Sequence, residues 1–138
     1  MSRITALDHI VLKSDNVERS LAFYCEALGL EGVRVKEWRD GTVRFPSVRI
    51  TGDTLIDIFP SEDSMASAGG QQLDHYCLVL EAGGLDELLV KVENFGLKPG
   101  PKLSRWGARG RGESSYVVGP EGVTVELRHY PDGYNDLL

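Results

Sequence analysis

The sequence has little cysteine, no excess of basic residues and no long apolar run. Its two cysteines, Cys25 and Cys77, lie in apolar-patterned segments and form no CxxC pair, which predicts buried thiols in a reducing, cytoplasmic compartment. Lys and Arg number 15 against 21 Asp and Glu, and the net charge of −6 argues against a nucleic-acid partner. The apolar stretch near the start is broken by Asp8, His9 and Lys13, so we expect neither a signal peptide nor a membrane span.

The feature that stands out is an internal repeat. The 138 residues, 41% of them apolar and 26% charged, suit one compact domain. Within it, residues 7–12 read LDHIVL and residues 73–78 read LDHYCL. The polar, Gly-rich stretch at 61–72 lies between the two copies and is typical of a linker. The repeat therefore predicts two related modules, at about 4–60 and 73–130.

Both modules show the same succession of elements. Apolar residues at spacings of three and four predict an amphipathic helix over 17–28, closed by Gly29, and another over 85–95, closed by Gly96. Three strand-like runs follow each helix, at 32–39, 42–50 and 54–59 in the first module and at 97–104, 113–118 and 122–130 in the second. Each module is thus a β-α-β-β-β unit of the α+β class. Because such a unit is too small for a stable core, we expect the two to complete one structure.

The repeat also places polar residues inside apolar strands. His9 and His75 occupy equivalent positions in the first strands, while Asp57 and Glu126 each stand among hydrophobic residues in the closing strands. A lone strand histidine is more often packed in a core, and a lone carboxylate usually faces solvent, but a buried carboxylate is costly without a partner. Two histidines and at least one carboxylate at repeat-related positions favour a divalent transition metal with open coordination positions.

Alternation along the last strand separates two faces. Glu126 shares its face with Thr124, Arg128 and Tyr130, whereas His129 points to the other side. The polar face is expected to line a cleft, so Arg128 and Tyr130 are substrate-binding candidates. His129 is interpreted as structural.

An unusual segment, KLSRWGARGRGE, occupies 102–113. Arg105, Arg109 and Arg111 alternate with glycines around Trp106. One interpretation is a mobile lid whose guanidinium groups hold a carboxylate or phosphate while Trp106 covers an apolar part of the substrate. The other is a solvated, flexible hairpin loop. Arg109 and Trp106 are therefore further substrate-binding candidates.

Three segments together carry a family resemblance. They are LDHIVLKSDNVERSLAFYCEALGL (7–30), LDHYCLVL (73–80) and SSYVVGPEGVTVELRHY (114–130). With them the chain resembles the vicinal oxygen chelate superfamily, which includes glyoxalase I, fosfomycin-resistance thiol transferases, extradiol dioxygenases and bleomycin-resistance proteins. Their joint occurrence is specific to the superfamily, but not to one activity.

The resemblance implies a curved mixed sheet, built from paired βαβββ modules, around a cleft with one divalent ion (Fe, Mn, Ni, Co or Zn). By motif position, His9, His75 and Glu126 correspond to its common ligands. Asp57 corresponds to a fourth ligand that glyoxalase-type members supply as Glu. Because Asp57 is one methylene shorter, the roles of ligand, catalytic base and structural residue stay open for it. Relatives commonly form dimers, so the resemblance also implies a homodimer.

Three functions fit these features. The main prediction is a glyoxalase-like lyase or isomerase, in which Glu126 or Asp57 moves a proton on a small, oxygen-rich, anionic substrate. The second is a ring-cleaving extradiol dioxygenase using Fe(II), with Tyr116 or Tyr130 as its acid–base group. The third is a non-catalytic resistance protein that binds an antibiotic or metabolite. Such binders generally lack the metal residues, which this chain keeps.

Overall fold

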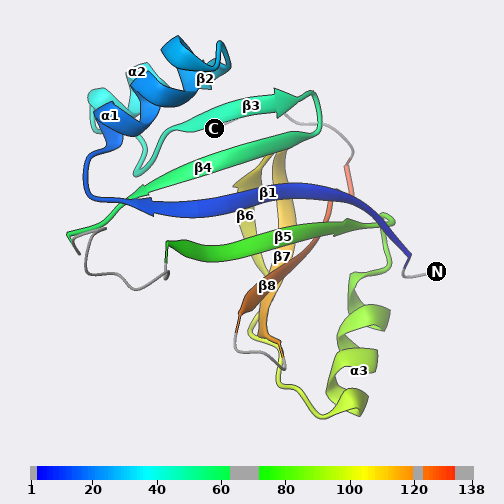
Figure 1. Ribbon diagram of the computed structural model, residues 1–138. Helices are drawn as coiled ribbons and strands as arrows, with labels where there is room; N and C mark the ends of the chain where they lie inside the picture. The colour runs from blue at the N-terminus through cyan, green and yellow to red at the C-terminus, as the bar shows by residue number, and fades with distance from the viewer. Residues whose placement is uncertain (1–2, 63–71, 120–122, 133–138) are drawn as a thin grey trace. The chain divides into compact units, whose positions relative to one another are not determined.

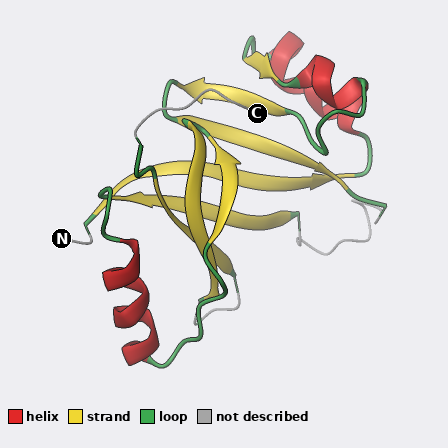
Figure 2. Ribbon diagram, turned by 180° about the vertical axis from the view of Figure 1, so that it is seen from behind, coloured by secondary structure: helices red, strands yellow, loops and turns green. Residues whose placement is uncertain are grey.

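The computed structural model describes residues 3–62, 72–119 and 123–132, which form strands and a few short helices (Figures 1 and 2). The elements in chain order are β1 (Ile4–Ser14), α1 (Val17–Leu21), the π-helix η1 (Ala22–Ala27), β2 (Glu31–Val33), α2 (Val35–Arg39), β3 (Ser47–Thr51), β4 (Thr54–Pro60), β5 (Leu73–Leu80), α3 (Leu85–Phe95), β6 (Leu103–Gly107), β7 (Gly110–Val118) and β8 (Thr124–His129). They fall into two compact units, Met1–His9 with His75–Leu138, and Ile10–Asp74. Strand β1 therefore contributes to both units.

In the unit Ile10–Asp74 the strand order is β2-β3-β4-β1. The β3–β4 pair is antiparallel, with Ser47 opposite Asp57. Its core consists of Val17, Leu21, Val48 and Ile58, so one face of α1 packs on β3 and β4. The arrangement buries the apolar stripe that the sequence pattern places on this helix.

The first predicted helix is confirmed, but it takes two forms. Asn16 caps its start, because its side chain accepts a hydrogen bond from the Arg19 backbone N–H at 3.0 Å. The α-helical turn of α1 then continues as the π-helix η1. Gly29 follows with φ of 74°, the left-handed conformation that glycine adopts without steric cost.

The predicted strand over 32–39 is confirmed only at its start, because residues 35–39 form a helix. Strand β2 ends at Val33, and α2 begins at Val35. Val35 and Trp38, three residues apart, both pack on the core of this unit, and that spacing suits a helix rather than a strand. The next strand begins at Ser47, later than the predicted run of 42–50.

In the other unit the strand order is β1-β5-β8-β7-β6. Strand β5 runs parallel to β8, whereas β8 and β7, and β7 and β6, are antiparallel. The sheet is thus mixed, and the predicted α+β class is confirmed. Helix α3 matches the predicted helix over 85–95, with Gly96 at φ 107° after its end. The core here is made by Leu80, Leu85, Val117 and Leu127.

The arginine-rich segment is not a loop. Residues 103–107 form β6 and 110–118 form most of a long β7, paired as an antiparallel hairpin whose turn is Ala108-Arg109. The predicted hairpin is thus present, but as two paired strands instead of a long loop, and the lid role of this segment stays a prediction. The predicted strand over 97–104 begins only at Leu103. Most of the predicted linker and of the turn before β8 lie outside the described residues.

Two further expectations concern thiols and membranes. Cys77 is buried and Cys25 half-buried, and neither forms a disulfide. None of the helices in the described ranges is long and apolar enough to cross a membrane.

Candidate metal centre

Strands β1, β5 and β8 bring three predicted ligands together in one unit. The Nε2 atoms of His9 and His75 lie 3.3 and 3.1 Å from Oε1 of Glu126. The imidazole rings meet edge to face, with centroids 5.6 Å apart. All three residues are at least 97% buried, and their ligand atoms lie within 4.8 Å of one another.

Arg128 holds the second oxygen of the Glu126 carboxylate. Its Nε and Nη2 donate to Oε2 at 3.2 and 2.8 Å. Burial opposes ionisation of Glu126, but hydrogen bonds with the two histidines and the charge of Arg128 bring its pKa well below the usual range. Glu126 is therefore a carboxylate with Oε1 directed at the histidines.

This donor set fits a divalent transition metal. Two imidazole nitrogens and one carboxylate oxygen on one side leave other coordination positions for exogenous ligands. A second cluster, Asp8, His9 and Cys77, shares one histidine with it. Burial raises the pKa of the Cys77 thiol to about 11, and both oxygens of Asp8 already accept hydrogen bonds, from His9, Ala108 and Tyr130. The first set is accordingly the better candidate.

Asp8 is the residue at this site that the sequence interpretation missed. It is fully buried beside His9, and its Oδ2 accepts hydrogen bonds from His9 Nδ1 at 2.7 Å and from the Ala108 N–H at 2.8 Å. Burial alone would raise the pKa of Asp8. Its pKa is nevertheless lowered, and the hydrogen bond with His9 is the largest of the interactions that lower it. The signal was present, because the repeated LDH triplet places an aspartate before each histidine.

Tyr116 lies directly beside the candidate ligands. It pairs with Glu126 across β7 and β8, and its ring centroid lies 5.1 Å from that of His75. The Arg105 guanidinium sits 4.3 Å above the Tyr116 ring, while its Nη1 donates to the carbonyl and hydroxyl oxygens of Ser114. A cation therefore lies over Tyr116, an aromatic side chain that contacts His75.

Arg128 and Tyr130, the predicted substrate-binding residues on the polar face of the last strand, make hydrogen bonds inside the protein. Arg128 is fully buried and also donates to the Arg105 and Trp106 carbonyls, at 2.9 and 3.1 Å. The Tyr130 hydroxyl donates to Asp8 and accepts a hydrogen bond from the Arg109 backbone N–H at 3.3 Å.

The hairpin glycines are explained by this packing. A Cβ at Gly107 would lie 2.6 Å from the Tyr130 hydroxyl and 2.7 Å from Cζ of Arg128. A Cβ at Gly112 would lie 2.7 Å from the His129 carbonyl oxygen. Glycine is therefore needed for close approach of strands and side chains rather than for mobility.

His129 and Asp57 lie in different surroundings. His129 accepts a hydrogen bond from the Gly83 N–H at 2.9 Å, and its Nε2 lies 3.0 Å from Glu113 Oε1, consistent with a structural role. Asp57 belongs to the unit Ile10–Asp74, where it is buried and accepts a hydrogen bond from Ser47 Oγ at 2.5 Å.

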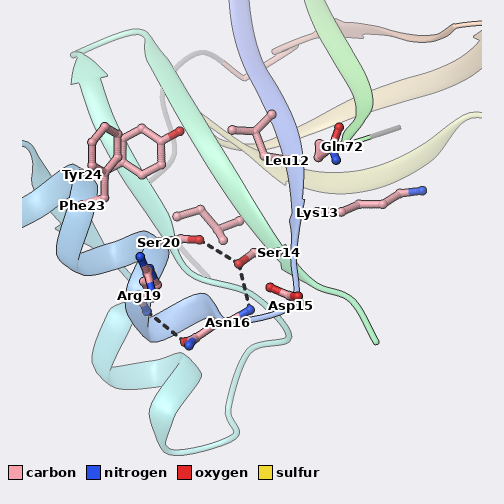
Figure 3. Close-up of a pocket in the computed structure, with 11 residues that line it drawn as sticks. Leu12, Lys13, Ser14, Asp15, Asn16, Arg19, Ser20, Phe23, Tyr24 and Gln72 are labelled. Atoms are coloured by element: carbon pink, nitrogen blue, oxygen red, sulfur yellow. Dashed lines mark hydrogen bonds between the residues drawn. The ribbon is translucent and has the colours of Figure 1, made fainter. Parts of the chain in front are cut away.

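A separate pocket of about 380 Å³ lies in the unit Ile10–Asp74 (Figure 3). Leu12, Ile58, Phe23 and Tyr24 supply apolar walls, and Ser14 and Ser20 are joined there by a hydrogen bond of 2.7 Å. It contains none of the three candidate ligands, so its size does not make it the centre of the chemistry.

The fold is that of glyoxalase-type proteins. A Mn(II)-bound glyoxalase from Novosphingobium aromaticivorans superposes with a TM-score of 0.75 at 18% identity, over 100% of this chain and 44% of that one. Methylmalonyl-CoA epimerase from Mycobacterium tuberculosis gives 0.65 at 18% identity, over 91% and 88%. At these identities the likeness concerns the fold.

Sequence comparison identifies the family. The family model described as the glyoxalase/bleomycin resistance protein/dioxygenase superfamily matches residues 6–127. This chain therefore belongs to that superfamily, which confirms the resemblance. Among curated proteins, the virulence protein STM3117 of Salmonella typhimurium is 26% identical over 129 residues, covering 92% of this chain and 85% of that protein.

Proposed function

We propose that this protein is a metal-dependent, glyoxalase-like lyase or isomerase that chelates the adjacent oxygens of a small anionic substrate. The observation that carries the proposal is the buried group of His9, His75 and Glu126, with their ligand atoms within 4.8 Å of one another. These residues would hold one divalent ion of Fe, Mn, Ni, Co or Zn. A bound ion supplies Lewis-acid polarisation of a substrate oxygen.

The neighbouring side chains support an anionic substrate. Arg105 is fixed over the Tyr116 ring, and Tyr116 contacts His75. A guanidinium held in this way is suited to a carboxylate or phosphate, and the phenol to a hydrogen bond with substrate oxygen. Because Arg128 and Tyr130 are buried, we assign recognition first to Arg105 and Tyr116, which are half-buried, with Trp106 and Arg109 as further candidates. Asp57 or Glu126 would move the proton.

Metal analysis tests the site itself. We expect one equivalent of divalent metal per chain in the wild type, and loss of binding in His75→Ala and Glu126→Gln. His129→Gln is the matched control, because it removes a histidine outside the candidate set and should keep the metal. The measurements are elemental analysis and calorimetric titration, with thermal unfolding of each variant as a check on folding. A wild type that binds no divalent metal when supplied with it would contradict the proposal.

Reaction class is tested by proton exchange. Anionic compounds with adjacent oxygens, such as 2-oxo and 2-hydroxy acids, should incorporate deuterium from D₂O at the carbon next to the carbonyl when metal is bound. NMR detects the exchange, and the metal-free Glu126→Gln variant provides the baseline.

An extradiol dioxygenase is the second candidate, because two histidines and one carboxylate also form the facial set of Fe(II) oxygenases. Oxygen uptake with catechols and Fe(II) would favour it. Ligand binding that needs no metal and gives no turnover would instead favour a non-catalytic binder.

We also propose that the protein is a cytoplasmic homodimer. Large apolar side chains are exposed in both units, among them Phe95 at 74%, Leu28 at 55% and Phe23 at 53%. Such side chains are candidates for a subunit interface. Light scattering after gel filtration measures the oligomeric state.

A further inference from the structure

Asp8 is a fully buried carboxylate whose contacts come from three parts of one unit. Oδ2 accepts from His9 Nδ1 at 2.7 Å and from the Ala108 N–H at 2.8 Å, and Oδ1 accepts from the Tyr130 hydroxyl. A buried carboxylate without such donors would be strongly unfavourable. Its side chain is therefore held in one orientation.

That orientation fixes the adjacent imidazole. With Nδ1 directed at Asp8, the His9 ring presents Nε2 to Glu126 Oε1, 3.3 Å away. A metal-binding histidine commonly donates its other ring N–H to a carboxylate, which sets the tautomer and strengthens the ligand.

The β6–β7 hairpin takes part in the same network. Its turn residues supply two backbone donors, Ala108 N–H to Asp8 and Arg109 N–H to the Tyr130 hydroxyl. Tyr130 in turn donates to Asp8. The turn and the end of β8 thus hold the carboxylate that orients His9.

The repeat offers an internal comparison. Asp74 stands before His75 as Asp8 stands before His9. Asp74, however, is 35% exposed and its Oδ1 lies 3.8 Å from the Lys13 ammonium. The same triplet therefore serves different purposes in its two copies.

We propose that Asp8 is a positioning residue of the metal centre, which holds His9 with Nδ1 on the Asp8 carboxylate and Nε2 facing Glu126, the neighbouring residue of the assigned ligand set. This inference rests on the proposed function. It predicts that metal affinity depends on Asp8, although the assigned ligands are His9, His75 and Glu126.

The test compares Zn²⁺ affinity of the full-length wild type, Asp8→Asn and Asp74→Asn by calorimetry. Asp8→Asn keeps the shape but removes the charge, and should weaken binding by about 10- to 100-fold. Asp74→Asn makes the same chemical change at the repeat-related position and should bind as the wild type does. In the Zn²⁺-loaded wild type, long-range ¹H–¹⁵N spectra should show a hydrogen on His9 Nδ1, with its resonance displaced in Asp8→Asn.

The outcomes separate the inference from the proposed function. Asp8→Asn could fold, bind Zn²⁺ as tightly as the wild type and keep the ¹H–¹⁵N resonance of His9 Nδ1 unchanged. That result would overturn the inference about Asp8 and leave the proposed function standing. A wild type that binds no metal overturns both. If Asp8→Asn does not fold, Tyr130→Phe removes one donor and leaves the carboxylate. It should then lower the affinity by a smaller factor, and unchanged affinity overturns the inference.

Discussion

At the scale of single residues, the candidate centre depends on one buried ion pair. Arg128 is fully buried, and its guanidinium contacts the Glu126 carboxylate and two backbone carbonyls. The sequence interpretation placed Arg128 in the cleft as a substrate contact. In the structure it neutralises Glu126 and ties β8 to β6, and a contact with substrate stays a prediction.

Replacing Arg128 by Met should therefore reduce the free energy of unfolding by about 3–5 kcal/mol, because it leaves Glu126 buried without its countercharge. Urea unfolding followed by circular dichroism measures the change. Arg111→Met is the matched control at an exposed position of β7, where a change within about 0.5 kcal/mol is expected. Equal, small effects of the two substitutions would show that the ion pair contributes little.

At the scale of elements, the β6–β7 hairpin shows what sequence patterns can and cannot predict. Helix α3 and the positions of His9, His75 and Glu126 were predictable, because periodicity and an internal repeat both report on them. Helix α2 was not, because five residues are too few to distinguish a helical from a strand period. The glycines of the hairpin suggested a mobile loop, since no local pattern reveals that Arg128 and Tyr130 pack against Gly107 and Gly112.

Gly112→Ala tests this packing. The added methyl group would meet the His129 carbonyl oxygen at 2.7 Å, and we expect a loss of about 1–3 kcal/mol in the free energy of unfolding from overpacking. Gly52→Ala is the control, because its methyl group would meet nothing within 4 Å. Chemical denaturation measures the free energy of unfolding of both variants. If Gly112→Ala is as stable as Gly52→Ala, the hairpin is not tightly packed at Gly112.

At the scale of the whole molecule, the three candidate ligands belong to one unit and Asp57 belongs to the other. In the repeat, His9 is equivalent to His75 and Asp57 to Glu126, so the sequence alone predicts one group of four. Equivalence in a repeat does not establish equal roles, as the contrast between Asp8 and Asp74 shows.

Hydrogen exchange with and without Zn²⁺ tests this division. A ligand at a hundredfold excess over its Kd adds about 2.7 kcal/mol to the free energy of unfolding. We expect slower exchange in β5, β8 and the beginning of β1, and no change in the Glu126→Gln control. Slower exchange in β4 as well would support Asp57 as a fourth ligand, whereas unchanged exchange in β5 and β8 would contradict the assigned set.

The candidate ligands come from β1, β5 and β8, three strands that lie far apart in the sequence. On a ribosome His9 emerges before His75, and Glu126 emerges with Arg128 on β8, after the other described strands. On the proposed function, a chain that stops before β8 carries both histidines yet lacks the carboxylate and the cation that orients it. Metal retention would then distinguish chains that contain β8 from chains that stop before it, a difference that follows from the order in which the strands are made.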